Sequence, residues 1–345
     1  MTIFKRKDKL LSHSSRLFYF LAILLWNIGG CRTQHQNTNL FGIYISTLDG
    51  RNMRVLVSDP YREMNHARVS PDQKWVTFTR YNKRGPKGLA MEKGGYEETE
   101  IMIIRLDGTG LESIVPPKKG IVAANGYWTP DGKGILYVST DNPERKPQIN
   151  LIDLKTRRII RIPTPEGFWV ADPHQVKDRL VFSVIKKGKK VCQCIWTMKV
   201  DGKDPVQLTS PKISSKKRVH PPLGDFDPKL SPDGKRVALM RQVKERIWHV
   251  VIVDLENGKE MDISPFDSVD AVPEWSSDGR LLIFWHVDPK RIKNSGLYTM
   301  RPDGKERKRI PLPHGYFYTM PAFFPREGPD GRIRIIFSAR KDRRF

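Results

Sequence analysis

Two strand-pair motifs alternate along this chain, and their repetition constrains the fold more than any other feature. The first motif is a short strand, a turn usually spelled Pro-Asp-Gly, and an apolar strand. The second is another strand pair around a polar or glycine-containing turn. In a Pro-Asp-Gly turn, proline presets φ, aspartate bonds its own backbone and glycine takes the positive φ, so the turn joins antiparallel neighbours. Copies of the first motif begin at His66, Gly126, Pro173, Asp227, Val272 and Met320, and copies of the second at Gly42, Glu100, Ile149, Ile195, Val250 and Leu297.

The order of the motifs predicts a closed ring. The chain opens with a second motif that has no partner (Gly42 to Val57) and closes with a first motif that has none (Met320 to Ala339). Pairing these two ends completes a sixth sheet and removes the exposed edges of an open array. Repeats of four antiparallel strands are typical of β-propellers. We therefore predict an all-β, six-bladed β-propeller of four-stranded antiparallel blades over residues 41–345, closed by N-terminal outer strands pairing with C-terminal inner strands; a β-sandwich with chance Asp-Gly turns is the alternative.

The first thirty residues have the pattern of an export signal. A basic leader precedes the apolar run Leu17 to Ile28, which is too short to span a bilayer and is typical of a signal peptide. The following Gly29-Gly30-Cys31 resembles the bacterial lipoprotein box, which implies cleavage before Cys31 and acylation of its thiol and new amine. We predict a signal peptide over 1–30, a tether over 31–40 and an exported, membrane-anchored lipoprotein, at the outer membrane and facing the periplasm if the cell is Gram-negative. An ordinary secretory signal or an uncleaved anchor are the alternatives.

The strong positive charge, formally +23, indicates surface chemistry rather than nucleic-acid binding. The Lys and Arg runs fall in predicted turns, loops and outer strands, where charge also prevents edge pairing. They lack the interleaved aromatic residues of a groove for single-stranded nucleic acid, so we expect no nucleic-acid partner. Anionic lipid headgroups and wall polymers are the surface partners that this charge favours. A generally basic proteome would explain the charge equally well.

The cysteines predict neither a metal site nor a disulfide framework. Cys192 and Cys194 lie two residues apart on a predicted strand, so they point to the same face in a geometry that disfavours a mutual disulfide. No His or Cys close by in the sequence completes a zinc ligand set. We therefore expect these two side chains to serve packing, and we predict no metal and no cofactor.

The repeats resemble a known family. The Ser-Pro-Asp-Gly turn with its apolar strand, clearest at residues 231–234 and 275–279, is similar to the WD40-like (PD40) repeats of the TolB propeller. The resemblance covers residues 41 to about 340. It implies a propeller that binds a protein partner, such as a peptidoglycan-associated lipoprotein, on one face of the ring, and it implies no catalytic residue. TolB-like proteins carry an α/β domain before the propeller, and the resemblance does not extend to it.

The predicted site is a funnel at one mouth of the ring's channel. The longer segments 82–99 and 211–226 and both chain ends are expected on this face, and long loops on a rigid scaffold are a common place for function. Acidic groups gathered there in a cationic protein would receive a basic side chain or a metal ion; alternatively, Asp and Asn at blade entrances bond turn amides. The funnel residues are Asn65, His66, Asn125, Tyr127, Asp172, His174, Asp225, Asp227, Asp270 and Tyr318.

These features predict a lipid-anchored cell-envelope propeller that acts as a monomeric protein-binding or scaffold module with an envelope or wall-associated partner. The alternative is a carbohydrate-active propeller enzyme, a lyase or glycosidase, that uses His with metal or paired carboxylates in the same funnel. A serine hydrolase that pairs a propeller with an α/β domain needs a G-x-S-x-G elbow, and the sequence has none.

Overall fold

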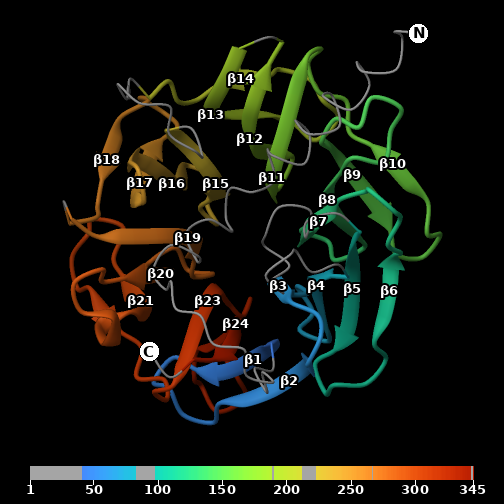
Figure 1. Ribbon diagram of the computed structural model, residues 1–345. Coiled ribbons are helices and arrows are strands. Elements are labelled where there is room, and N and C mark those ends of the chain that lie inside the picture. The colour runs from blue at the N-terminus through green and yellow to red at the C-terminus, as the bar shows by residue number, and fades with distance from the viewer. Residues whose placement is uncertain (1–40, 83–97, 189, 212–222, 266, 343–344) are drawn as a thin grey trace, which may run out of the picture.

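The computed structural model describes residues 41–82, 98–188, 190–211, 223–265, 267–342 and 345, without the side chains of 190–192. This part of the chain forms six four-stranded antiparallel sheets, arranged as blades around a central axis (Figure 1). The ring confirms the predicted all-β, six-bladed propeller. Residues 1–40 lie outside the described residues, and with them the predicted signal peptide, Cys31 and the tether.

The blades are numbered in chain order, and the first strand of each is the innermost (Figure 1). Blade 1 contains β3 (Met64–Val69), β4 (Trp75–Tyr81), β5 (Thr99–Arg105) and β6 (Glu112–Val115); blade 2 contains β7 (Ala123–Trp128), β8 (Gly134–Ser139), β9 (Gln148–Asp153) and β10 (Ile159–Arg161); blade 3 contains β11 (Phe168–Val176), β12 (Arg179–Lys187), β13 (Lys190–Lys199) and β14 (Val206–Gln207). Blade 4 contains β15 (Gly224–Leu230), β16 (Arg236–Lys244), β17 (Ile247–Asp254) and β18 (Glu260–Asp262); blade 5 contains β19 (Val269–Trp275), β20 (Leu282–Val287), β21 (Gly296–Met300) and β22 (Lys308–Arg309), with the short 3-10 helix η1 (Ile292–Asn294) before β21; blade 6 contains β23 (Tyr316–Phe323), β24 (Arg334–Lys341), β1 (Phe41–Thr47) and β2 (Arg54–Asp59).

The first and last strands of the described domain pair with each other. In blade 6 the strand order is β2-β1-β24-β23, and β1 runs antiparallel to β24 from Phe41 opposite Arg340 to Thr47 opposite Arg334. The N-terminal strands are therefore the outer half of a blade whose inner half is C-terminal. This is the closure that the phasing of the motifs predicts, and it joins the two ends of the ring through backbone hydrogen bonds.

The β15–β16 turn has the backbone conformation and the hydrogen bond that the sequence predicts for Pro-Asp-Gly. In the β15–β16 turn, Gly234 has a φ of +77° and the Asp233 carboxylate accepts the Lys235 N–H at 3.0 Å. The Ser231 hydroxyl donates to the same carboxylate oxygen of Asp233 at 2.5 Å. This turn holds β15 and β16 in register.

Apolar side chains from adjacent blades pack against each other and form the core. The second strands contribute fully buried aromatic rings, including Phe78, Phe182, Phe284 and Phe337. Each such ring stabilises the fold by about 1.5–3 kcal/mol through burial alone. Within the described residues, no helix is long and apolar enough to cross a bilayer.

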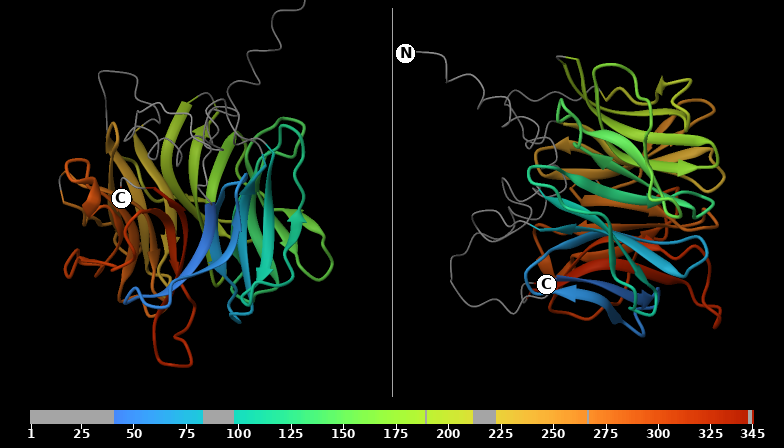
Figure 2. Two further views of the ribbon diagram at one scale, coloured as in Figure 1. Left: turned by 60° about the horizontal axis from the view of Figure 1, so that its bottom comes forward. Right: turned by 90° about the vertical axis from the view of Figure 1, so that its right-hand side faces the viewer.

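The ring has two different faces, seen edge-on in Figure 2. We call the face at which β3, β7, β11, β15, β19 and β23 begin the loop face, and the opposite side, which carries the tight turns, the turn face. Phe41 and Phe345, the ends of the described chain, lie on the loop face, because Phe41 pairs with Arg340 near the end of β24 and the Phe345 N–H donates to the Asp342 carbonyl. Residues 83–97 and 212–222, which make up most of the two predicted long segments, lie outside the described residues.

Candidate functional site

A β-bulge interrupts the innermost strand of every blade at the same place. The register between the first two strands breaks at Asn65/Arg68 in blade 1 and at the equivalent positions in the other five blades. One non-glycine residue at each bulge has a φ between 50° and 58°, in the left-handed region. These residues are His66, Asn125, Asp172, Asp227, Val272 and Met320.

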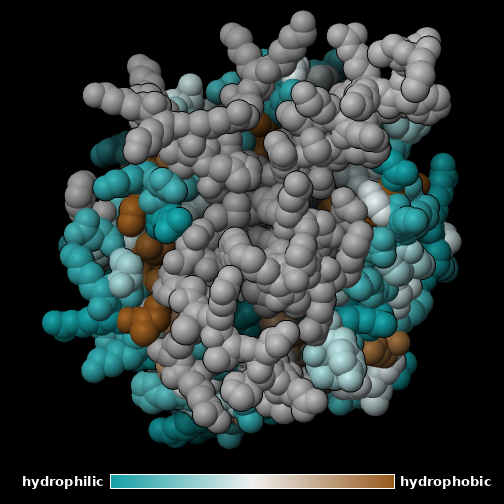
Figure 3. Space-filling view, viewed as in Figure 1, coloured by the Kyte–Doolittle hydropathy of each residue, from teal (hydrophilic) through white to brown (hydrophobic). Residues whose placement is uncertain are grey.

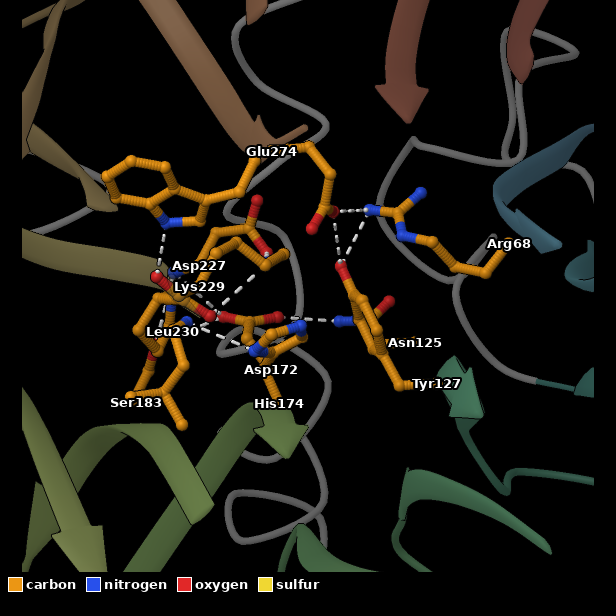
Figure 4. A network of polar contacts seen from close by, with 12 residues as sticks. Arg68, Asn125, Tyr127, Asp172, His174, Ser183, Asp227, Lys229, Leu230 and Glu274 are labelled. Atoms are coloured by element: carbon orange, nitrogen blue, oxygen red, sulfur yellow. Dashed lines mark hydrogen bonds and ion pairs between the residues drawn. The ribbon is translucent and has the colours of Figure 1, made fainter. Parts of the chain in front are cut away.

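The left-handed conformation at the bulge is imposed by the fold and does not depend on the type of amino acid at that position. Asn and Asp tolerate this conformation through local hydrogen bonds, but a β-branched residue such as Val272 does not favour it. Bulges bend a strand and change the direction of its side chains. The side chains two residues beyond the bulge in blades 1 to 5, and those at the bulge itself in blades 2 to 4, therefore meet at the centre of the ring (Figure 4).

One group of these side chains crosses the axis. Arg68 of blade 1 lies 2.9 Å from the Glu274 carboxylate of blade 5 and donates to the Tyr127 hydroxyl of blade 2 at 2.6 Å. The Tyr127 hydroxyl in turn donates to Glu274 at 3.4 Å. Blades 2 and 5 are opposite each other in the ring, so these contacts span the central channel. All three side chains are buried.

A second group surrounds Asp172. Its carboxylate accepts the Asn125 side-chain amide at 2.6 Å and the Ser183 hydroxyl at 3.2 Å (Figure 4). Next to it, the Lys229 ammonium is ion-paired with Asp227 and lies 5.0 Å from the centre of the Tyr127 ring. Lys229 is 0% exposed, so Asp227 supplies its principal counter-charge. We call Arg68, Asn125, Tyr127, Asp172, Asp227, Lys229 and Glu274 the axial cluster.

Burial controls protonation in and around the axial cluster. Desolvation, followed by the repulsion from Asp227, raises the pKa of Asp172 to about 6. Desolvation lowers the pKa of His66 to about 3 and lowers the pKa of His174 well below its usual value. His174 is accordingly a neutral acceptor, whose Nδ1 receives the Leu230 N–H at 3.1 Å. The two buried cations, Arg68 and Lys229, balance two carboxylates, and Asp172 adds a third charge only when it ionises.

Tryptophan side chains fix the backbone on which the two cations are placed. The Trp128 indole N–H donates to the Arg68 carbonyl, and the Trp275 indole N–H donates to the Lys229 carbonyl, both at 2.9 Å. Each indole comes from the end of the next blade's innermost strand. These equivalent hydrogen bonds connect blade 1 with blade 2 and blade 4 with blade 5, next to the axial cluster.

Six of the ten predicted funnel residues lie at this centre: His66, Asn125, Tyr127, Asp172, His174 and Asp227. Sequence reasoning missed Arg68, Lys229 and Glu274. The repeat alignment contains a signal for them, because they occupy the same position in their motif copies as Tyr127 and His174, which were predicted, occupy in theirs. The predicted basic partner for the acidic groups is thus supplied by the chain itself.

The other four predicted funnel residues do not reach the axis. Asp225 is ion-paired with Arg241 of its own blade at 2.6 Å, and Asp270 is ion-paired with Arg307 of its own blade at 2.7 Å. The Tyr318 hydroxyl donates to the Pro313 carbonyl at 2.6 Å, and Asn65 lies between blades 6 and 1. The reason is the bulge: side chains two apart on a regular strand share a face, but a bulge between them breaks that alternation.

No group of three or more His, Cys, Asp or Glu side chains in the described part of the chain is arranged to hold a metal ion. Cys194 is 2% exposed and disulfide-bonded. The prediction that this cysteine serves packing alone is therefore wrong. Cys192 is among the residues whose side chains are not described.

Comparison with known proteins identifies the fold. No protein-family model matches the chain, and no curated protein matches it in sequence. Among solved structures, a putative TolB from Agrobacterium tumefaciens is similar with a TM-score of 0.64 and 16% identity, over 88% of this chain and 99% of that one. TolB from Acinetobacter baumannii gives 0.58 and 17%, over 88% of this chain and 64% of that one, and a nidogen/laminin complex gives 0.55 and 12%, over 80% and 93%. The chain thus spans about two thirds of the A. baumannii protein, and it has the propeller fold found in TolB proteins.

Proposed function

We propose that this chain is an exported, lipid-anchored β-propeller that binds a protein partner on its loop face. The observation that supports this most is the axial cluster, in which both cations at the centre of the ring are buried and each is ion-paired with a carboxylate. Such groups hold blades together and do not offer free charge to a substrate. The surface around the channel mouth is then the part of the rigid ring that is available for binding.

The predicted N-terminal tether also favours binding on the loop face. Strand β1 begins at Phe41 on the loop face, and a tether over 31–40 reaches about 35 Å at most from an acylated Cys31. Two or more acyl chains give stable membrane anchoring. The loop face would then lie close to the membrane. Its described rim is mainly hydrophilic (Figure 3), so a partner there would be bound largely through polar contacts, as in transient interfaces.

A carbohydrate-active enzyme is the second candidate, and Asp172 is the observation in its favour. A buried carboxylic acid with a pKa of about 6 has the property that a general acid needs near neutral pH. Glycosidases and related enzymes need a second carboxylate that is free to act. Asp227 and Glu274 are the nearest such groups, and each is ion-paired with a buried cation. The binding module is therefore the better supported function.

Photocrosslinking in intact membranes tests the proposal. A photoreactive phenylalanine analogue replaces Tyr61, which is 74% exposed between β2 and β3 on the loop face, or Leu111, which is 47% exposed on the turn face. We expect the analogue at position 61 to crosslink one envelope protein and the matched analogue at position 111 to crosslink none. Cys31→Ala should release the protein from membranes. Equal crosslinking from both positions would contradict the loop-face assignment, and polysaccharide turnover lost in Asp172→Asn would favour the enzyme.

A further inference from the structure

A small pocket opens on the loop face where blade 6 meets blade 1. It lies between the first residues of β3 and β23, and it encloses about 310 Å³ of empty space including its open mouth. Its polar lining comes from both blades, with Glu63 and Asn65 from blade 1 and Thr319, Ser338 and Arg340 from blade 6. The pocket is thus at the seam of the ring, outside the axial cluster.

Two buried hydroxyl groups line this pocket without partners. Thr319 and Ser338 are directly opposite each other on β23 and β24, and they are 5% and 3% exposed. Neither Thr319 Oγ1 nor Ser338 Oγ makes a hydrogen bond within the described part of the chain. Buried hydroxyls in folded proteins almost always have a partner, so two such groups in one pocket indicate a ligand or a water.

The equivalent hydroxyls at other blade interfaces are occupied. Thr79 of blade 1 accepts the N–H of Asn125 in blade 2 at 3.0 Å, and Ser183 of blade 3 accepts the N–H of Asp227 in blade 4 at 3.2 Å. Ser338 has the same register position in blade 6, since each of these residues pairs with the one just before the bulge. At the seam, Ser338 Oγ lines the pocket and accepts no hydrogen bond from blade 1 within the described residues.

The charged residues that line the pocket and its small volume limit which chemical groups it can bind. The Glu63 carboxylate disfavours an anion, and the Arg340 guanidinium disfavours a cation. The water-accessible interior is about 20 Å³, enough for one hydroxyl-sized group and too small for a carboxylate or phosphate. A neutral hydroxyl can donate to a carboxylate and also accept from Thr319 or Ser338.

We propose that the seam pocket binds a neutral saccharide or other polyol, which inserts one hydroxyl group between Thr319 and Ser338 while its body remains at the open mouth. The pocket is open at its mouth, so a ligand can present one hydroxyl group from outside. Because both blades contribute to the site, the ligand binds the closed ring only and stabilises it by mass action.

The test uses glucose as the neutral probe, with glucuronate and glucosamine as charged counterparts, on the whole folded protein. Saturation-transfer NMR and calorimetric titration should give a dissociation constant for glucose of about 1–10 mM, as expected for a monosaccharide. Thr319→Val combined with Ser338→Ala should weaken binding about tenfold or more. Thr319→Ser, which keeps a hydroxyl, and Ser210→Ala, at an exposed serine elsewhere on the loop face, should leave the affinity within about twofold of wild type.

Three results would overturn the proposal. One is tighter binding of either charged probe than of glucose. Another is an equal dissociation constant for glucose in the wild type and in the double variant, since the sugar would then bind elsewhere on the protein. The third is no glucose binding at about 50 mM together with a crystal structure in which a single water bonds both hydroxyls. Circular dichroism spectra of the variants establish that they are folded, and none of these results bears on the binding of a protein partner.

Discussion

From the buried carboxyl of Asp172 we predict how the free energy of unfolding changes with pH. Desolvation and then Asp227 raise the pKa of Asp172 from 3.8 to about 6. Between these two pH values the folded protein keeps a proton that the unfolded chain has released, so stability falls as pH rises through this window. The gap between the two pKa values corresponds to about 3 kcal/mol, and the full destabilisation is present above about pH 6.

Asp172→Asn removes the charge while keeping an oxygen that can accept the Asn125 amide. Relative to wild type, the variant should therefore gain about 2–3 kcal/mol in free energy of unfolding between pH 4 and pH 8. Urea denaturation of both proteins at the two pH values measures this difference. Asp178→Asn, at an exposed position of the β11–β12 turn, is the matched control and should change the pH dependence by less than about 0.5 kcal/mol. A gain below about 1 kcal/mol for the Asp172 variant would refute the assignment of a buried, destabilising charge at the centre of the ring.

Three further predictions follow from the same structure. Lys229→Met leaves Asp227 buried without its cation and should lower the free energy of unfolding by about 3–5 kcal/mol, most of it recovered when Asp227→Asn is added; no recovery would show that the pair is not the cause. Although burial opposes it, hydrogen bonds from His286 and Arg307 lower the pKa of Asp270 to about 2, so this group stabilises the protein above pH 3.8 by about 2 kcal/mol, and the stabilisation should disappear in acid and in Asp270→Asn. Lengthening the tether 31–40 should change partner capture from membranes but leave the urea midpoint unchanged, and equal capture by short and long tethers would count against a loop face held near the membrane.

The repeat pattern was sufficient to predict the fold, because turn chemistry and strand alternation are local properties. The Pro-Asp-Gly sequence at 232–234 specifies its own turn, and six strand-pair motifs of this kind, three of them with that spelling, leave one way to pair the ends. Ring closure between β1 and β24 followed from counting half-motifs. It needed no knowledge of which residues touch.

The centre of the ring could be predicted only in part, because the bulge is not visible in the sequence. His66, Asp172 and Val272 share one backbone conformation but no common chemistry, so no residue type marks the position. A regular strand would have placed Asp225 and Asp227 on one face, whereas the bulge sends Asp225 to Arg241 and Asp227 to Lys229. The hydroxyls of the seam pocket were also not predictable, since their missing partners depend on the packing of two blades far apart in the chain.

The pairing of β1 with β24 also has a consequence for how the protein matures. Residues 41 and 340 are opposite each other on paired strands, so the first strand of the ring must wait until the last one has been synthesised. Contacts between such distant parts of a chain form slowly, and during the delay the edge of β1 remains open to incorrect pairing. If the chain is exported in an unfolded state, the ring can form only after β24 has been delivered, and the interval before then is when the protein would most need a chaperone.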